Sequence, residues 1–283
     1  MDTPPAAPLT VAAVQATPVP GEIAHNASVG ARLVEQAADA GARLVVLPEL
    51  FLCAYHPPTL HADPAASDLP AAATGEIGDG RLDALRSAAR ERSVVVVVGA
   101  SVRHADGRRT CAAVVVDRAG DAIAAYDKQL LWGPEENALF TPGTTGATLV
   151  VDGWRLGLGI CYDGCFPEHG RAAADDGAHG YLAPSGYVVG SAHRRDLYYA
   201  ARALDNTMYV VFANSVGGDA DWSFNGGAAV YDPEGRPIER AADEGEAVVV
   251  ATLDPAELAR VRAAHTMLRD RRDLGGRRIL TAN

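Results

Sequence analysis

Short aliphatic runs alternate with longer amphipathic stretches along the chain, beginning with residues 9–14, 26–40 and 44–47. The first and third runs have the length and composition of strands, whereas the apolar positions of the stretch between them have helical spacing. The alternation continues with a helix predicted over residues 78–92 and a buried strand over residues 94–100. Strands and helices that alternate in this way predict an α/β layer structure.

Turn residues separate the strands that are predicted in the rest of the chain. Gly120 and Asp152-Gly153 mark two of these turns. The apolar runs predict a meandering sheet in the middle of the chain, then an alanine-rich helix over residues 192–206 and further strands, over residues 112–117, 122–126, 148–151, 155–160, 209–213, 227–231 and 247–253. No repeat of solenoid period and no low-complexity linker divides the chain, so we predict a single domain.

The predicted domain covers residues 9–264, between a flexible N-terminal segment (1–8) and a C-terminal segment (265–283). A chain of 283 residues with 48% hydrophobic and 22% charged residues is typical of a globular protein. Its net charge of -11 repels phosphate backbones and anionic lipids, so we expect neither nucleic acid nor a membrane as partner. The segment 1–8 lacks the features of a signal peptide, and we expect a cytoplasmic protein.

The motif GICYDGCFPE (residues 159–168) is the strongest local sign of chemistry. An apolar strand ends at Cys161, and a helix can begin around Phe166 or Pro167. A thiol near a helix N-terminus is stabilised as thiolate, and a sharp turn presents the sulfur to a substrate. The local context leaves a nucleophile and an inert buried thiol both open. Four cysteines are too few for a disulfide framework: Cys53, Cys111, Cys161 and Cys165.

Two further residues stand at the ends of strand-like runs. Glu49 follows the apolar run 44–47, at the strand end where ligand sites of α/β sheets lie, and desolvation there raises a carboxyl pKa toward neutral pH. A capping or ion-paired surface role is the alternative for Glu49. Lys128, the only lysine of the chain, follows the run 122–126. A compact ammonium can stabilise an oxyanion, and a solvated surface charge is the alternative.

The spacing of Cys161, Cys165 and His169 also allows a zinc site. We do not favour it, because Pro167 interrupts the stretch and no matching pair of Cys or His residues occurs elsewhere. No Gly-rich phosphate loop of the Walker or dinucleotide type is present. The sequence therefore predicts no metal site and no nucleotide cofactor.

Glu49, Lys128 and Cys161, in this order, resemble the Glu-Lys-Cys triad of the nitrilase superfamily of carbon–nitrogen hydrolases. The resemblance begins with VAAVQATP, continues through LPELFLCAYH, YDKQLLWGPEENALFTPG and GICYDGCFPE, and extends to ARALDNTMYVVFANSVGG and VYDPEGRP. It implies a four-layer αββα sandwich, a homodimer or higher homo-oligomer, and catalysis without cofactor or metal.

The resemblance also implies a role for each residue. Cys161 attacks an amide, carbamoyl or nitrile carbon, with Glu49 as general base and acid. Lys128, with the backbone N–H of Tyr162, holds the tetrahedral oxyanion. Glu136 fits the second glutamate that supports the lysine or the substrate. Candidates for lining the pocket, for which ordinary loop packing is the alternative, are Tyr55, Trp132, Tyr162, Ser185 and Tyr187.

Three positions depart from the family pattern: Leu130 replaces a histidine, Asp205 a glutamate and Ala228 a serine. We predict an amidase or N-carbamoyl amide hydrolase that acts on a small metabolite. The alternatives are a nitrilase and a non-catalytic binding protein with the same fold. The acidic surface disfavours strongly anionic substrates unless a local pocket charge overrides it. The arginine-rich segment 265–283 is predicted to contact a partner subunit.

Overall fold

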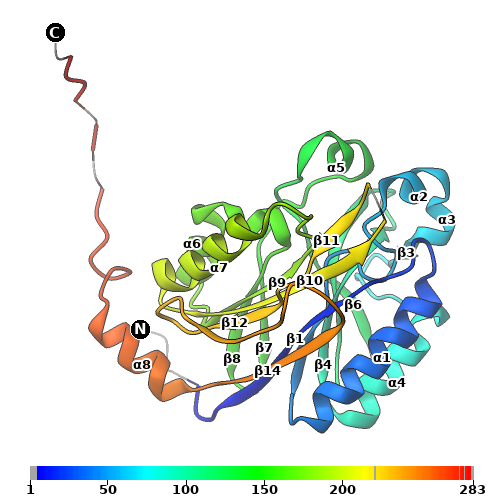
Figure 1. Ribbon diagram of the computed structural model, residues 1–283, viewed down its shortest axis with the longest axis horizontal. Coiled ribbons are helices and arrows are strands. Elements are labelled where there is room, and N and C mark those ends of the chain that lie inside the picture. The colour runs from blue at the N-terminus through cyan, green and yellow to red at the C-terminus, as the bar shows by residue number, and fades with distance from the viewer. Residues whose placement is uncertain (1–4, 220, 274, 277, 282–283) are drawn as a thin grey trace.

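The computed structural model describes residues 5–219, 221–273, 275–276 and 278–281, and places helices on the outside of a β-structure (Figure 1). The longest path of hydrogen-bonded strands runs β6 (Ala122–Asp127), β5 (Arg109–Val116), β4 (Val95–Arg103), β2 (Leu44–Val46), β1 (Leu9–Ala16), β10 (Tyr209–Gly218), β9 (Gly180–Ser185), β8 (Trp154–Leu158) and β7 (Ala147–Val151). Neighbours from β4 through β8 are parallel, whereas the β4–β5, β5–β6 and β7–β8 pairs are antiparallel.

The two halves of this strand path form the inner layers of a sandwich. β9 contacts β2 and β4, although β1 and β10 lie between them in the strand order. The helices α1 (Ile23–Asp39) and α4 (Asp83–Arg92) pack together on one outer face, and α6 (Pro167–Asp175) and α7 (Ala192–Asn206) pack together on the other. The predicted single-domain, four-layer αββα sandwich is therefore confirmed.

The burial of the strands explains their composition. Every residue of β5 is buried, as is every residue of β4 except Arg103, because both faces of these strands are covered. Strands buried on both faces are continuous aliphatic runs, which is the pattern seen in this part of the sequence. A second core cluster, which includes Tyr181, Tyr199 and Phe212, fills the space under α7.

The predicted elements are present, and the remaining ones are short. The predicted helix over residues 78–92 begins with a 3-10 turn, Gly80–Leu82, in which the backbone N–H of Arg81 donates to the side chain of Asp79. Most elements that the sequence did not predict have seven residues or fewer and are too short for a periodic pattern, the exception being the 10-residue helix α8 (Pro255–Ala264). The elements not yet given are α2 (Pro57–Ala62), α3 (Pro64–Ser67), β3 (Asp68–Pro70), α5 (Gly133–Leu139), β11 (Ser223–Asn225), β12 (Ala229–Tyr231), β13 (Pro237–Arg240) and β14 (Ala247–Leu253).

The two terminal segments differ in their contacts with the domain. The carbonyl of Ala7 accepts a hydrogen bond of 2.9 Å from the indole of Trp154, and Pro5 is buried. Residues 1–4 of the predicted N-terminal segment lie outside the described residues. After α8, the chain runs away from the domain (Figure 1), with an ion pair between Arg271 and Asp175 on α6. Among the described helices, none is long and apolar enough to cross a membrane.

Candidate active site

Glu49, Lys128 and Cys161 lie beyond the carboxyl ends of three strands, β2, β6 and β8. These strands run in the same direction, since the pairs from β2 through β8 are parallel and β6 is two antiparallel steps from β4. Strands of common direction bring their carboxyl ends to one edge of the fold, where ligand sites of α/β proteins form. This topology gathers three residues that are far apart in the sequence.

Lys128 is the centre of a buried group of charges. Its ammonium donates hydrogen bonds to Glu49 Oε1 at 2.6 Å and to Glu136 Oε1 and Oε2 at 2.7 and 2.8 Å, and all three side chains are excluded from solvent. Glu136, on α5, also accepts hydrogen bonds from the hydroxyl of Tyr55 and the backbone N–H of Trp132. The predicted pairing of Glu136 with the lysine is therefore present in the structure.

Burial and neighbouring charges set the protonation of this group. Burial raises the pKa of Glu49 to about 7, although Lys128 opposes the shift. Burial by itself would lower the pKa of Lys128, but Glu136 and Glu49 outweigh it and raise that pKa well above its usual value. The lysine therefore stays charged, and Glu49 changes protonation near neutral pH.

Glu49 keeps one carboxylate oxygen free. Oε1 binds Lys128, whereas Oε2 is buried and has no hydrogen-bond partner among the residues that the structure describes. A Cβ atom on Gly186, which lines the pocket, would lie 3.0 Å from Oε2. Gly186 has no side chain in this space, so Oε2 can lie directly behind the backbone of the pocket wall. A free carboxylate oxygen in this place can accept a proton.

The backbone holds Glu49 in place through strained and close contacts. Leu50, the next residue, has a left-handed φ of 48°. A Cβ on Gly99 of β4 would collide with the backbone of residues 48–50, at 2.2 Å from Leu50 N, so only glycine fits there. The N–H of Glu49 also donates to the carbonyl of Ser185 at 3.3 Å. The turn after β2 is thus fixed on two sides.

Cys161 begins a 3-10 helix, Cys161–Cys165, that connects β8 to α6. Its φ of 45° is in the left-handed region, which a non-glycine residue adopts only when its surroundings hold it there. The hydroxyl of Tyr199 donates to the Cys161 carbonyl at 2.9 Å and supplies part of that support. The turn predicted at Cys161 is confirmed, and α6 begins at Pro167 as the sequence indicated.

The expectation that a helix N-terminus stabilises a Cys161 thiolate is wrong. Burial, followed by the charge of Glu49, raises the pKa of Cys161 well above its usual value, and Lys128 and the amide of Gly186 do not compensate. The 3-10 turn separates Cys161 from the start of α6, so the helix dipole is distant. The resting group is a thiol, and a base must remove its proton before attack.

Asp163 connects the cysteine turn to the loop after Lys128. Its Oδ2 accepts hydrogen bonds from Ile160 N–H at 2.9 Å and from the hydroxyl of Tyr126 at 2.7 Å, and its Oδ1 accepts one from Leu130 N–H at 2.9 Å. Sequence analysis missed this residue. The available signal was an acidic side chain inside an otherwise apolar turn, which requires buried partners.

The alternative zinc site is not assembled. His169 uses both ring nitrogens on tyrosines, Nε2 with Tyr126 at 2.8 Å and Nδ1 with Tyr181 at 2.9 Å. The sulfur of Cys165 contacts the hydroxyl of Tyr187 at 3.2 Å. Over the described part of the chain, no group of three or more His, Cys, Asp or Glu side chains is arranged to hold a metal ion.

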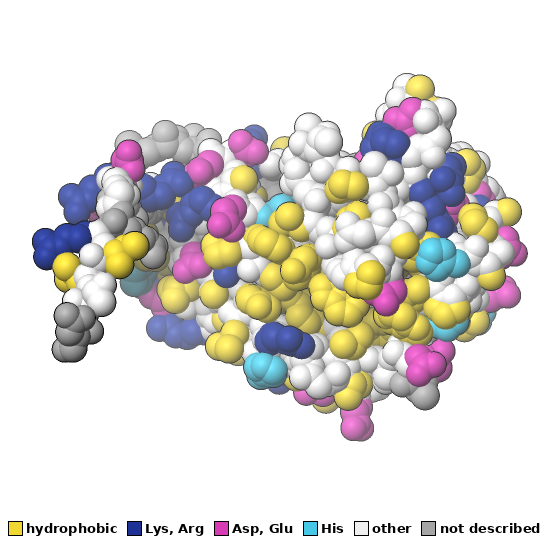
Figure 2. Space-filling model, turned by 90° about the horizontal axis from the view of Figure 1, so that it is seen from above, with side chains coloured by type: hydrophobic (Ala, Val, Ile, Leu, Met, Phe, Trp, Pro, Cys, Tyr) yellow, Lys and Arg dark blue, Asp and Glu magenta, His cyan; other side chains and the backbone are white. Residues whose placement is uncertain are grey.

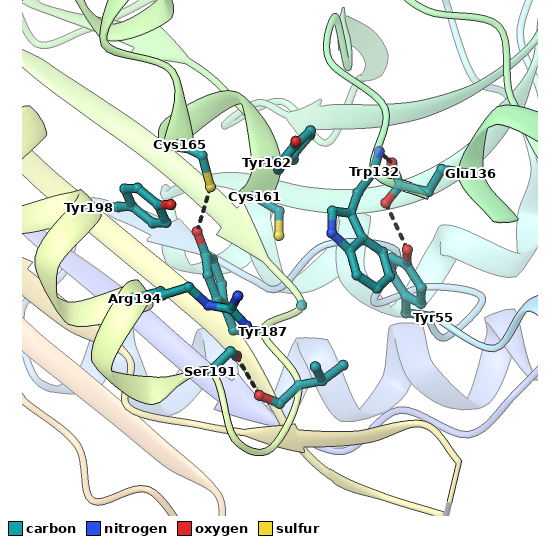
Figure 3. A pocket seen from close by; sticks show the side chains of 12 residues that line it. Tyr55, Trp132, Glu136, Cys161, Tyr162, Cys165, Tyr187, Ser191, Arg194 and Tyr198 are labelled. Carbon is teal, nitrogen blue, oxygen red and sulfur yellow. Dashed lines mark hydrogen bonds between the residues drawn. The ribbon is translucent and has the colours of Figure 1, made fainter. Parts of the chain in front are cut away.

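A cavity of about 160 Å³ opens onto Cys161 (Figure 3). Figure 2 shows the molecule from the top of Figure 1, the side on which α5 lies. On this face, hydrophobic side chains gather across the middle of the molecule. The residues that line the cavity are Tyr55, Trp132, Glu136, Cys161, Tyr162, Cys165, Gly186, Tyr187, Val188, Ser191, Arg194 and Tyr198. Its wall is largely aromatic, as is common for sites that bind small molecules.

Four of the five predicted lining residues border this cavity, namely Tyr55, Trp132, Tyr162 and Tyr187. Ser185 does not line it. Its side chain is fully buried, and its hydroxyl lies 3.0 Å from the hydroxyl of Tyr199. Sequence analysis missed the residues around the start of α7, because the sequence does not show which face of that helix is turned toward the cysteine.

Comparisons with known proteins agree with this architecture. Residues 10–263 match the model of the carbon–nitrogen hydrolase family. An (R)-stereoselective amidase from a Pseudomonas species is 38% identical over 195 residues, 68% of this chain and 69% of that one. A nitrilase from Pyrococcus abyssi is 31% identical over 267 residues, 93% and 97% of the two chains.

A solved structure is also similar to this chain over nearly its whole length. A double mutant of the amidase from Nesterenkonia sp. AN1, in complex with acrylamide, superposes with a TM-score of 0.79 at 30% identity, over 93% of this chain and 94% of that chain. In another mutant of that amidase, acrylamide has added to the active-site cysteine.

The fold and these comparisons define an amidase- or nitrilase-type carbon–nitrogen hydrolase, which confirms the predicted class of enzyme. The chain belongs to the carbon–nitrogen hydrolase family, within the nitrilase superfamily that its motifs resemble.

Proposed function

We propose that this chain hydrolyses the amide bond of a small molecule through a thioester on Cys161. The observation that carries the proposal is the meeting of three groups beside one cavity. These groups are a thiol at a strained turn, a carboxyl group with a free buried oxygen, and a buried ammonium. Each supplies one function that acyl transfer needs: a nucleophile, a base and a cation for the oxyanion.

The proposed reaction has two halves. Glu49 accepts the thiol proton while the Cys161 sulfur attacks the carbonyl carbon. Lys128 and the backbone N–H of Tyr162 stabilise the oxyanion, and Glu136 holds Lys128 in place. The carbon–nitrogen bond then breaks, and Glu49 returns the proton to the departing nitrogen. In the second half, Glu49 takes a proton from water, the water oxygen attacks the thioester, and the carboxylic acid leaves as the thiol re-forms.

Ammonia release from a panel of small amides, N-carbamoyl compounds and nitriles tests the proposal. We expect turnover of an amide or carbamoyl compound, together with an acyl adduct on Cys161 in quenched samples by mass spectrometry. Turnover of nitriles alone would assign the nitrilase alternative instead. Silence across the panel without any adduct on Cys161 would favour the non-catalytic alternative.

The pKa of Glu49 predicts a pH profile. Burial raises this pKa to about 7, so the carboxyl stays protonated, and unable to accept the thiol proton, up to neutral pH. For an amide substrate that does not titrate, we expect kcat/KM to rise as the pH increases through about 7. Initial rates in buffers of constant ionic strength measure the profile. A rise centred near the ordinary carboxyl value of 4.5 would contradict the raised pKa of Glu49.

The C-terminal segment 265–283 is proposed to contact a partner subunit in a homodimer or larger assembly. Its described residues form neither helix nor strand, and Leu280 and Ile279 are 74% and 89% exposed. We expect truncation after Ala264 to lower the oligomeric mass in light scattering, because this exposed apolar surface would lose its contacts. Unchanged mass would contradict the proposal.

A cytoplasmic location is also proposed. All four cysteines are free, and a reducing compartment keeps cysteines as the thiols that the proposed mechanism needs.

A further inference from the structure

Arg194 lines the same cavity as Cys161 and has no partner for its charge. It lies in the first turn of α7, and Figure 3 shows its side chain extending from this helix toward Tyr187. Within the part of the chain that the structure describes, its guanidinium makes no hydrogen bond and no ion pair. Arg194 is exposed to solvent as well as lining the cavity, and because a guanidinium has five N–H donors in a fixed fork, its side chain can offer a binding group to a molecule in the cavity.

The other described arginines of the domain bind acids, carbonyls or, for Arg90, the hydroxyl of Ser87. Arg195, the next residue, is buried, donates to Asn225 O at 2.9 Å and pairs with Asp243 at 3.0 Å. Arg202, two turns further along α7, pairs with Asp205 at 3.2 Å. Among the described arginines, the ones without a hydrogen bond or ion pair besides Arg194 are Arg272 and Arg278, both outside the domain in the C-terminal segment.

Arg194 also gives the open part of the cavity a positive charge. Glu136 is the other charged side chain that lines the cavity, and its carboxylate is bound by Lys128, Tyr55 and a backbone N–H. In Figure 3, Arg194 and Tyr198 lie on one side of Cys161, opposite Glu136 and Tyr55. The protein carries a net charge of -11, but an anion inside this pocket meets an unpaired cation.

We infer that the pocket binds a small amide that carries a carboxylate, with the amide carbonyl at Cys161 and the carboxylate on Arg194. The inference rests on the proposed function, which places the amide at Cys161. A guanidinium fork matches a carboxylate with two parallel hydrogen bonds. A cavity of about 160 Å³ fits a short chain, since an apolar cavity of about 150 Å³ holds one benzene molecule.

The carboxylate can belong to either side of the scissile bond. On the acyl side, the substrate is the monoamide of a short dicarboxylic acid. On the amine side, it is an N-carbamoyl amino acid. Both place a carboxylate a few bonds from the carbonyl carbon, and both fit the same contact with Arg194. Succinamate and N-carbamoyl-β-alanine therefore serve as the two anionic probes.

A turnover experiment compares each probe with a neutral analogue in which a methyl ketone replaces the carboxylate, 4-oxopentanamide and 4-ureidobutan-2-one. We expect the wild type to prefer one of the anionic probes. Arg194→Gln is expected to lower kcat/KM for that probe by about 10- to 100-fold, mainly through KM, and to change the value for the neutral analogue far less. Arg194→Lys should retain part of the preference, because it keeps the charge without the fork.

Arg92→Gln is the matched control, because it removes the same charge from α4 on the opposite outer face. We expect this control to leave the preference for the anionic probe intact. Equal losses for anionic and neutral substrates in Arg194→Gln would overturn the inference, as would a wild type that hydrolyses both equally well. Either result would leave the proposed amide hydrolysis standing.

A binding experiment separates the two proposals without turnover. Iodoacetamide alkylates Cys161, and mass spectrometry of the peptide that contains it gives the rate. We expect succinate to slow alkylation in the wild type but not in Arg194→Gln, whereas sodium chloride of equal ionic strength should protect neither. Protection without turnover of any amide would reject the proposed function and keep the carboxylate site. Turnover without charge preference or protection would reject the carboxylate site alone.

Discussion

A Cys161→Ala variant is expected to lose amide hydrolysis by at least about ten-thousand-fold, because alanine provides no nucleophile and the remaining groups act only on a bound substrate. The side chain is small and partly exposed in the cavity, so the fold should persist. Ammonia release measures the loss, and quenched mass spectrometry should show no acyl adduct. Far-ultraviolet circular dichroism and the thermal midpoint confirm that the variant is folded.

Cys165→Ala provides the matched control, because Cys165 lines the same cavity four residues further along. Its sulfur contacts the hydroxyl of Tyr187, and burial raises its pKa above the usual value. This variant is expected to lose less than about ten-fold, since it removes one weak contact and no reacting atom. Full activity in Cys161→Ala, or an adduct on Cys165 in the wild type, would reject Cys161 as the nucleophile.

The sequence predicted where the groups proposed to react would lie, because strand ends can be recognised locally. Glu49 and Cys161 each follow an apolar run, and the direction of a strand decides which of its ends meets the others. The close approach of Lys128 to two carboxylates could be expected only from the family resemblance. The spacing of residues along the chain does not give the distances between strands. Only the structure shows that the Lys128 ammonium lies 2.6 Å from Glu49 Oε1.

Two expectations failed for reasons that a linear pattern does not contain. The predicted thiolate depended on a helix start close to Cys161, but a 3-10 turn intervenes and Glu49 adds a nearby negative charge. The second is Ser185, a candidate for the pocket wall that does not line the cavity. It is the last residue of β9, where side chains alternate between faces, and its own side chain is directed to Tyr199.

Arg194 could not be assigned from the sequence. Helix α7 is rich in alanine and arginine, and its pattern does not show which of its exposed arginines also lines a pocket. The adjacent Arg194 and Arg195 have different surroundings in the structure. Arg194 lines the cavity without a partner, whereas Arg195 is buried and forms an ion pair. Contact between α7 and the 3-10 helix that begins at Cys161 brings the arginine to the site.

Lys128→Met is expected to remove activity and to destabilise the fold. Methionine keeps most of the side-chain volume but leaves Glu49 and Glu136 buried without a cation. Breaking a buried ion pair by removing one partner costs about 3–5 kcal/mol in the free energy of unfolding. Loss of the proposed oxyanion contact is expected to lower kcat by at least about a hundred-fold. Urea unfolding and ammonia release measure the two effects separately.

The pH dependence distinguishes lost charge from lost packing. In the wild type Lys128 lowers the pKa of Glu49 against the effect of burial, so Lys128→Met raises that pKa further. The folded variant then binds a proton that the unfolded chain, with an ordinary value of 4.5, releases. Stability falls with rising pH wherever the folded state binds more protons than the unfolded chain, and below about pH 7 both folded proteins hold the Glu49 proton. The deficit relative to wild type should therefore be constant below about pH 7 and grow as the pH rises above it.

The double variant Lys128→Met/Glu136→Gln completes the test, because it removes one of the two carboxylates that the single change leaves unpaired. Part of the lost stability should return at neutral pH, since Glu136 is then no longer a buried carboxylate without its cation. Activity should stay lost, because the cation proposed to hold the oxyanion is still missing. A deficit in Lys128→Met that is independent of pH and unchanged in the double variant would instead assign to Lys128 a packing role, and would contradict the electrostatic one.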